Sequence, residues 1–126
     1  MIRLLSVART GTRFTKKILD DHNLKYFHTH FWGKYNIPDY DGVIVIPRRD
    51  KEACRPRWNQ YHSRYAYGFD DVWLEMEDYI ERNRDNVYQL HVDDPNERLL
   101  ELQQLSYAVG VDLHADFSKK VGEGRP

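Results

Sequence analysis

The sequence has only one cysteine, Cys54, so no disulfide can form within the chain. A reducing compartment is the default for such a chain, and the cytoplasm is therefore expected. No apolar run approaches the ~18 residues of a membrane-spanning helix. The first residues show neither the long apolar run nor the small-residue cleavage site of a signal peptide. These absences exclude a disulfide scaffold and make a membrane partner unexpected.

Charge is abundant but unevenly distributed. The chain has 126 residues, 31% of them charged and 40% hydrophobic, which predicts one globular domain over residues 1–126 with a flexible tail from about residue 115. The net charge of −1 hides an asymmetry, because residues 1–63 hold 12 Lys and Arg against 6 Asp and Glu. An anionic ligand is expected in that basic half, although an uneven solvated surface has the same composition.

Buried strands are expected where short apolar runs recur. These runs are residues 2–7, 24–30, 42–46 and 86–92. The run GVIVI at 42–46 is continuous and β-branched, as in a parallel sheet covered on both faces. Pro47 is expected to end it.

Helices are expected between these strands and after the last one, where apolar residues recur every 3.6 positions. They are residues 12–21, a segment starting near 50, residues 69–82 and a segment from Pro95 to Gly110. Pro56 predicts a bend or break in the second helix, and Asp70 is a plausible N-cap of the third. The buried side of the last helix is expected to consist of Leu99, Leu102, Leu105 and Val109.

The element order β-α-β-β-α-α-β-α predicts an α/β protein with three layers, in which helices cover both faces of a mainly parallel sheet of about four strands. Ligands of such folds bind outside the carboxyl ends of the strands. The segments after Val7, His30 and Ile46 are therefore expected to converge on one crevice.

The stretch SVARTGTRFTKKIL at residues 6–19 places basic and hydroxyl residues around one Gly, between a strand and a helix. The first turn of a helix leaves backbone N–H groups unpaired, and such groups bind anions. Gly11 would let the backbone come close, while Arg9 and Arg13 add charge and forked donors. Against the Walker A pattern, Ser6 stands at the first Gly, Thr12 at the Lys, and Arg13 at the hydroxyl residue that would hold magnesium. These differences disfavour a magnesium-dependent kinase. An ordinary strand-to-helix turn capped by Thr10 is the alternative interpretation.

The segment ARTGTRF resembles the 5′-phosphosulfate loop of the sulfotransferase family, which lies between the first strand and the first helix of a P-loop-like fold. The resemblance implies that Arg9 touches the 5′-phosphate and the transferring sulfuryl group. It also implies that Thr10, Gly11, Thr12 and Arg13 wrap the 5′-phosphate.

The segment PRRDKEACRPRW resembles the 3′-phosphate segment of the same family, which runs Arg-Asp-Pro, several residues, then Ser and often Trp. Arg49 and Asp50 match the opening pair, and Trp58 matches the aromatic residue. Lys51 replaces the Pro, and Arg57 stands where the Ser is expected. The resemblance implies phosphate contacts from Arg49, and Arg57 would bind a phosphate more strongly than a hydroxyl does. A basic, solvated helix start is the alternative interpretation.

The segment FHTHFW at residues 27–32 resembles the Lys-Thr-His at the end of a family strand. His30 falls on the His that is the catalytic base, and His28 falls on the Lys. Residues two apart on a strand face the same way, and imidazole titrates near neutral pH, as a base should. A surface metal site, or simply two polar residues at a strand end, would give the same pattern.

The resemblance as a whole implies a compact sulfotransferase that uses 3′-phosphoadenosine 5′-phosphosulfate as donor. The acceptor would be a hydroxyl or amine of a small molecule or glycan. His30 would take the acceptor's proton, and Arg9 would stabilise charge on the leaving phosphate. No metal is expected, because no carboxylate pair or Cys/His cluster has ligand spacing.

Two further hypotheses remain open. In the first, the chain is a non-catalytic nucleotide- or phosphate-binding protein that kept the fold, as its short length and the missing Ser suggest. Alternatively, the basic residues of 51–57 and Arg64 would contact a protein or nucleic acid, although nucleic acid is not the expected partner. Oligomeric state is left open.

The middle of the chain is rich in aromatic residues, which are interpreted first as core. An acceptor pocket, a platform for adenine and a partner surface are the other interpretations. The residues concerned are Phe31, Trp32, Tyr35, Tyr40, Tyr61, Tyr65 and Tyr67.

Overall fold

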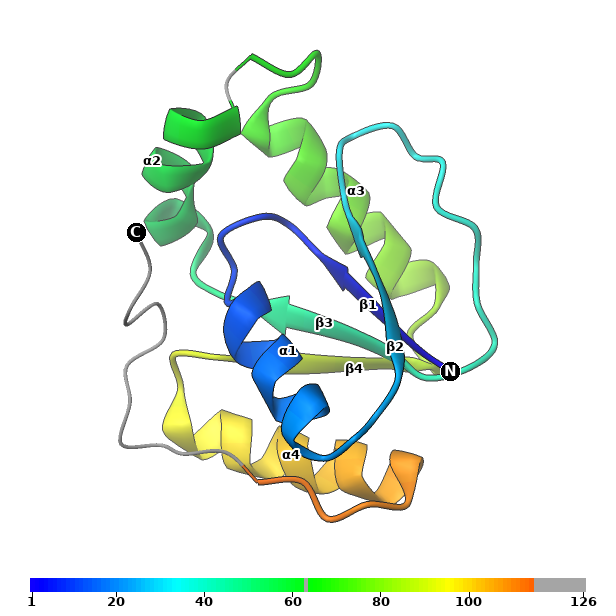
Figure 1. The fold of residues 1–126 in the computed structure, drawn as a ribbon. Helices are drawn as coiled ribbons and strands as arrows, with labels where there is room; N and C mark the ends of the chain where they lie inside the picture. The colour runs from blue at the N-terminus through cyan, green and yellow to red at the C-terminus, as the bar shows by residue number, and fades with distance from the viewer. Residues whose placement is uncertain (63, 115–126) are drawn as a thin grey trace.

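A computed structural model describes residues 1–62 and 64–114 of the chain. Its centre is a sheet of four parallel strands in the order β2-β1-β3-β4 (Figure 1). The strands are β1 (Ile2–Ser6), β2 (Tyr26–His30), β3 (Ile44–Arg48) and β4 (Val87–His91). Ser6 pairs with His30 and Arg48 pairs with His91, so the strands end together at one edge of the sheet. The predicted α/β class with a parallel sheet is confirmed.

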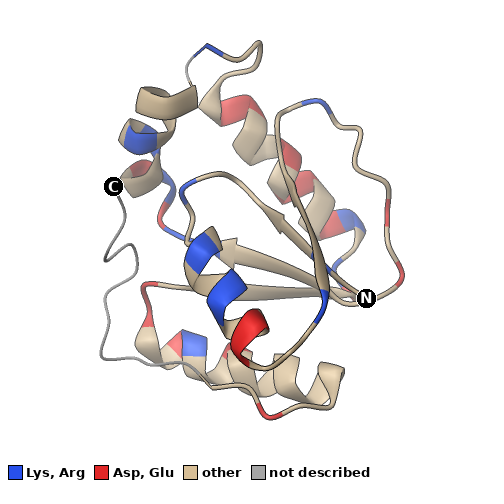
Figure 2. Ribbon diagram, in the orientation of Figure 1, with Lys and Arg blue, Asp and Glu red and all other residues tan. Residues whose placement is uncertain are grey.

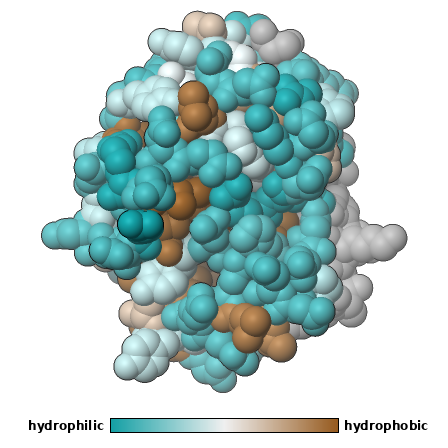
Figure 3. All heavy atoms as spheres, turned by 180° about the vertical axis from the view of Figure 1, so that it is seen from behind, coloured by the Kyte–Doolittle hydropathy of each residue, from teal (hydrophilic) through white to brown (hydrophobic). Residues whose placement is uncertain are grey.

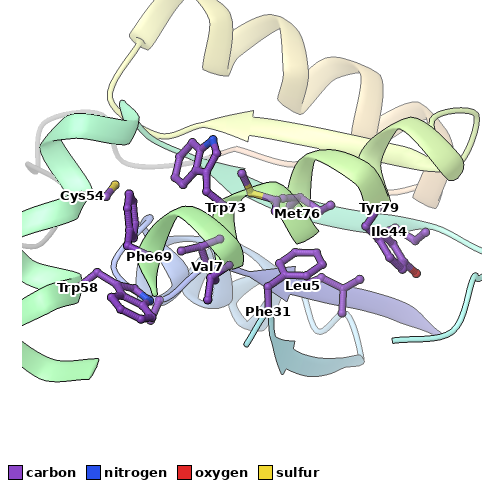
Figure 4. Packing of buried hydrophobic residues seen from close by; sticks show 13 residues of the cluster. Leu5, Val7, Phe31, Ile44, Cys54, Trp58, Phe69, Trp73, Met76 and Tyr79 are labelled. Atoms are coloured by element: carbon purple, nitrogen blue, oxygen red, sulfur yellow. The ribbon is translucent and has the colours of Figure 1, made fainter. Parts of the chain in front are cut away.

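Helices cover both faces of the sheet (Figure 1). They are α1 (Thr12–Asp21), α2 (Lys51–His62), α3 (Phe69–Arg82) and α4 (Pro95–Val109). Two hydrophobic clusters fill the spaces between the layers. Because neighbouring strand residues point to opposite faces, Leu5 packs with Met76 of α3 (Figure 4), whereas Leu4 packs with Ile18 of α1 and Leu102 of α4. The sheet thus lies between two layers of helices, which gives the three predicted layers.

Pro47 does not end the third strand, as the sequence predicts, because β3 continues through it to Arg48. The N–H of Ile44 donates to Asn86 on the β4 side, and successive strand residues alternate. The N–H that Pro47 lacks therefore falls on the β1 side, beyond the point where the β1–β3 pairing ends at Val45. The ladder to β4 loses no hydrogen bond.

Helix α2 also runs through its proline without a break, so of the predicted bend or break at Pro56 the break does not occur. A proline within a helix removes one hydrogen bond to the carbonyl four residues earlier. That carbonyl belongs to Glu52, which is exposed in the first turn, where water can satisfy it.

The helix ends show two further differences from the predictions. Asp70 is not the N-cap of α3, because the cap is Gly68, whose N–H donates to the Asp71 carboxylate at 3.1 Å. Leu99 is 49% exposed rather than buried, since α4 turns Arg98, Leu102 and Leu105 toward the sheet. The predicted limits of α4 are confirmed, because Pro95 lies in its first turn and Gly110 follows its last residue.

The face seen from behind in Figure 3 is mostly hydrophilic, with separate hydrophobic patches. Over residues 1–62 and 64–114, we find no helix with the length and apolar character needed to cross a bilayer.

Candidate anion-binding site

The loop between β1 and α1 lies at the carboxyl edge of the sheet, where ligands of parallel α/β folds bind. Two of its residues have left-handed backbone, Arg9 with φ 73° and Gly11 with φ 93°. Thr10 and Gly11 are buried, Arg9 is half-buried and Arg13 is exposed. Two guanidinium side chains of the loop therefore remain within reach of solvent.

A run of backbone donors in this loop has no partner in the protein. Among residues 1–62 and 64–114, no acceptor receives a hydrogen bond from the N–H groups of residues 9–13. The first intrahelical bond of α1 is donated by Thr15 to the carbonyl of Gly11 at 3.0 Å. Unpaired amides at a helix start favour an anion, and alternating backbone conformations such as this one form anion-binding concavities.

The two threonine hydroxyls of the loop are already committed to protein acceptors. Thr10 Oγ1 donates to the carbonyl of Val7 at 2.6 Å, and Thr12 Oγ1 donates to Ser6 Oγ at 3.0 Å. A hydroxyl has a single proton to donate. Thr10 and Thr12 would therefore offer an anion their backbone N–H groups. Thr10 also does not cap α1, because its N-cap is Gly11, without a side-chain cap.

Gly11 has a packing role of its own. A Cβ at this position would lie 2.7 Å and 2.9 Å from the two methyl carbons of Val92, which follows β4. The positive φ also disfavours any residue with a Cβ. The glycine therefore lets the loop pack directly on the β4–α4 connection.

Ser6 links the loop to both histidines of β2. Its Oγ lies 3.0 Å from His28 Nε2 and 3.3 Å from His30 Nδ1, while His30 Nδ1 is also 3.3 Å from the Ser6 carbonyl. A carbonyl only accepts, so His30 carries its proton on Nδ1. Ser6 Oγ then accepts from Thr12 and donates to His28. This assignment leaves the lone pair of His30 on Nε2.

Both imidazoles are neutral at neutral pH. Burial, with smaller contributions from the nearby His30 and Lys16, lowers the pKa of His28 to about 4. Burial also lowers the pKa of His30, against the hydrogen bond to the Ser6 carbonyl, which raises it. A neutral imidazole with a free nitrogen is able to accept a proton.

Arg9 and Arg57 approach the same aromatic ring. The Arg9 guanidinium carbon lies 4.1 Å from the centroid of the Tyr61 ring, and that of Arg57 lies 5.9 Å from it. Tyr61 and Arg57 come from α2, while Arg9 comes from the loop before α1. The Cys54 thiol of α2 also contacts the Arg9 carbonyl at 3.6 Å. The two basic segments predicted from the sequence are therefore neighbours.

Arg49 lies near these residues but is paired. Its guanidinium donates to both oxygens of Asp93, from Nε at 2.5 Å and from Nη2 at 3.1 Å. Its positive charge acts on the buried thiol of Cys54, although burial dominates and raises the pKa of that thiol to about 11. The pair with Asp93 is half-exposed, and such pairs contribute little to stability, so an incoming phosphate is able to displace the carboxylate. Basic residues on α1, α2 and the β3–α2 connection are seen in Figure 2.

The interpretation of the aromatic residues as core is correct for Phe31, which is fully buried, and in part for Tyr40, which is partly buried against the same cluster. Tyr35, Tyr61, Tyr65 and Tyr67 are between 41% and 48% exposed. Trp58, matched above to the family's aromatic residue, is 1% exposed and packs with Phe69 in the core (Figure 4). Its ring offers no open face for a ligand.

Two residues of this site escape the sequence analysis. Ser6 is identified only through its contacts with His28 and His30, because a Ser at a strand end has no distinctive pattern. His62 lies against Trp32 and Tyr65, with ring centroids 5.7 Å apart in each case. No spacing in the sequence connects it with the loop.

A second cluster of potential ligands lies at the end of β4. His91 Nδ1 is 2.6 Å from Glu101 and 3.6 Å from Glu97. Glu101 also accepts the His91 backbone N–H at 2.8 Å, so these contacts tie α4 to the strand. The Lys- and Gly-rich residues 119–124 lie outside the described residues.

No protein-family model, curated protein or solved structure matches the chain.

Proposed function

We propose that the protein transfers a sulfuryl group from 3′-phosphoadenosine 5′-phosphosulfate to a hydroxyl or amine acceptor. The observation that carries the proposal is the row of unpartnered N–H groups at residues 9–13 beside Arg9, next to a neutral His30 on the adjoining strand. An anion site and a free proton acceptor at one strand edge are the two parts that such a transfer needs.

The loop would act on the leaving phosphate. Sulfuryl transfer breaks the bond between sulfur and the bridging oxygen, and negative charge develops on the 5′-phosphate. Fixed N–H donors and guanidinium groups aimed at that oxygen lower the barrier. Arg9 and Arg13 would supply the guanidinium groups, together with the amides of Thr10, Gly11 and Thr12.

His30 would act on the acceptor. As the acceptor oxygen or nitrogen forms its bond to sulfur, it must lose a proton, and His30 Nε2 would take it. The proton on Nδ1 remains hydrogen-bonded to Ser6, which holds the imidazole in the tautomer that this step needs.

The 3′-phosphate of the donor would lie on the side of α2. Arg57 is exposed on that helix, and Arg49 precedes it. Binding there requires Arg49 to exchange Asp93 for the phosphate, which would be a charge-assisted contact of the same kind.

A non-catalytic phosphate- or nucleotide-binding protein is the second candidate. Three observations favour it: the committed hydroxyl protons of Thr10 and Thr12, the pairing of Arg49, and the packing of Gly11 on Val92. These features give residues of the site a structural role, and none of them requires a catalysed transfer.

The first experiment compares thermal stabilisation by 3′-phosphoadenosine 5′-phosphate, ATP and adenosine monophosphate. A ligand at 100 times its Kd adds about 2.7 kcal/mol to stability, so the bisphosphate should raise Tm more than the others do. Arg9→Ala should remove this shift. Arg84→Ala is the matched control, because Arg84 is an exposed arginine of the α3–β4 turn that pairs with Glu81.

The second experiment follows labelled sulfate from the donor to a panel of alcohols and amines. His30→Gln should abolish transfer while leaving the bisphosphate-induced Tm shift in place. Binding without transfer in the unmodified protein would establish the second candidate instead. A bisphosphate that raises Tm no more than adenosine monophosphate does would refute both.

A further inference from the structure

His62, at the end of α2, is a half-buried residue in which neither ring nitrogen is hydrogen-bonded. Both Nδ1 and Nε2 are shielded from solvent and have no hydrogen-bond partner among residues 1–62 and 64–114. One helical turn earlier, Trp58 Nε1 is in the same situation. The two rings are neighbours, with centroids 5.6 Å apart. Buried polar groups are nearly always hydrogen-bonded, so we expect this pair of residues to have a partner outside the described residues, such as a water or a ligand.

The surroundings of His62 place it beside the proposed site. Trp32 lies between the two imidazoles, with its centroid 5.1 Å from His30 and 5.7 Å from His62. The preceding residue, Tyr61, carries the Arg9 guanidinium over its ring at 4.1 Å. His62 thus approaches from α2 the same groups that β2 and the loop bring to the carboxyl edge of the sheet.

The electrostatic surroundings of His62 favour an anion. Burial lowers the pKa of the imidazole, and the charges of Arg9 and Arg64 and the neighbouring His30 lower it further. The cations that act on the ring are Arg9 and Arg64. A neutral imidazole there has one N–H to donate, and the field of these cations attracts an anionic acceptor.

We propose that His62 is a further ligand-binding residue of this site, where its ring donates a hydrogen bond to a non-bridging oxygen of a bound phosphate or sulfuryl group. The proposal rests on the function proposed above and adds a donor from α2 to those of Arg9 and the loop amides. The ligand class is a tetrahedral oxyanion, either free or as part of a nucleotide.

Two variants separate this role from simple packing. His62→Phe keeps a ring against Trp32, Trp58 and Tyr65 but removes both nitrogens. It should leave the stability of the ligand-free protein unchanged or raise it, because two unsatisfied atoms disappear. His22→Phe is the control, since His22 lies at the other end of α1 and its nitrogens contact Ile18 and His114.

The binding test is calorimetric titration with inorganic phosphate, inorganic sulfate and 3′-phosphoadenosine 5′-phosphate. A hydrogen bond to a charged group corresponds to about a tenfold to hundredfold change in Kd. His62→Phe should weaken binding of all three probes by this amount, and His22→Phe should not. In the unmodified protein, the nitrogen resonances of the His62 ring should shift during the phosphate titration.

The outcomes distinguish this inference from the proposed function. If the unmodified protein binds the probes and His62→Phe binds them equally well, with no shift of the His62 resonances, His62 is not a ligand contact, while the proposed function stands. Equal binding together with a loss of stability would assign the two nitrogens to a buried water instead. If the unmodified protein binds none of the three probes, both proposals are wrong.

Discussion

Substitution of Gly11 by Ala tests the packing on which the candidate loop depends. Gly11 and Gly110 both have left-handed backbone, with φ 93° and 73°. They differ in their surroundings, because a Cβ on Gly110 would meet no atom within 4 Å, whereas one on Gly11 would meet the methyl groups of Val92 at 2.7 Å and 2.9 Å. The two glycines therefore separate the cost of backbone strain from the cost of close contact.

The magnitude follows from these two contributions. A left-handed residue with a Cβ costs roughly 1–2 kcal/mol, and this is the whole effect expected for Gly110→Ala. Overpacking a buried contact adds about 1–3 kcal/mol. Val92 is fully buried and β-branched, so its methyl groups have little freedom to move away. Gly11→Ala should therefore lower the free energy of unfolding by about 2–5 kcal/mol, which is a large part of the 5–15 kcal/mol typical of a domain.

The assay is urea denaturation followed by tryptophan fluorescence, with Gly11→Ala, Gly110→Ala and Val92→Ala measured singly. The double variant Gly11→Ala/Val92→Ala completes a thermodynamic cycle. Because Val92→Ala removes the methyl groups in question, the two substitutions together should cost less than the sum of their separate effects. Equal destabilisation by the two glycine substitutions, or strict additivity in the cycle, would refute the close-contact argument.

Two further predictions concern a buried carboxylate and a half-buried imidazole. Glu75 is 2% exposed, and its carboxylate accepts the N–H groups of Gly33 at 2.7 Å and Tyr35 at 2.6 Å. Glu75→Gln should lower the free energy of unfolding by about 2–3 kcal/mol in urea denaturation, because the amide NH2 group would face one of these two N–H donors. Exposed Glu81→Gln should change stability little, and a similar loss for both variants would contradict this account. The pKa of His28 is about 4 in the folded protein, below its ordinary 6.5, so the unfolded chain binds the proton first as the pH falls. Stability from this group is present above pH 6.5 and is lost toward pH 4, with about 1–2 kcal/mol lost between pH 7 and 5. His28→Gln should show a smaller loss over this interval, and an unchanged pH dependence would show that the His28 imidazole is not its source.

Much of the fold could be predicted because the patterns are local. The bounds of α1 and α3 agree with the predicted helices, since apolar residues at the helical period define each one. Pro47 and Leu99 were predicted wrongly for a shared reason. Whether Pro47 loses a hydrogen bond, or whether Leu99 is covered, depends on which element lies beside it, and that neighbour is distant in the sequence.

The candidate site shows the same division. The sequence by itself predicted that the loop, the end of β2 and the segment after β3 meet, because parallel strands end at one edge of a sheet. Only the tertiary structure revealed that Ser6 joins the two histidines, that Asp93 neutralises Arg49 and that His62 lies beside Arg9. Order along the chain determines which strand ends face one side, whereas the partner of each polar side chain depends on distances of a few ångströms that packing alone establishes.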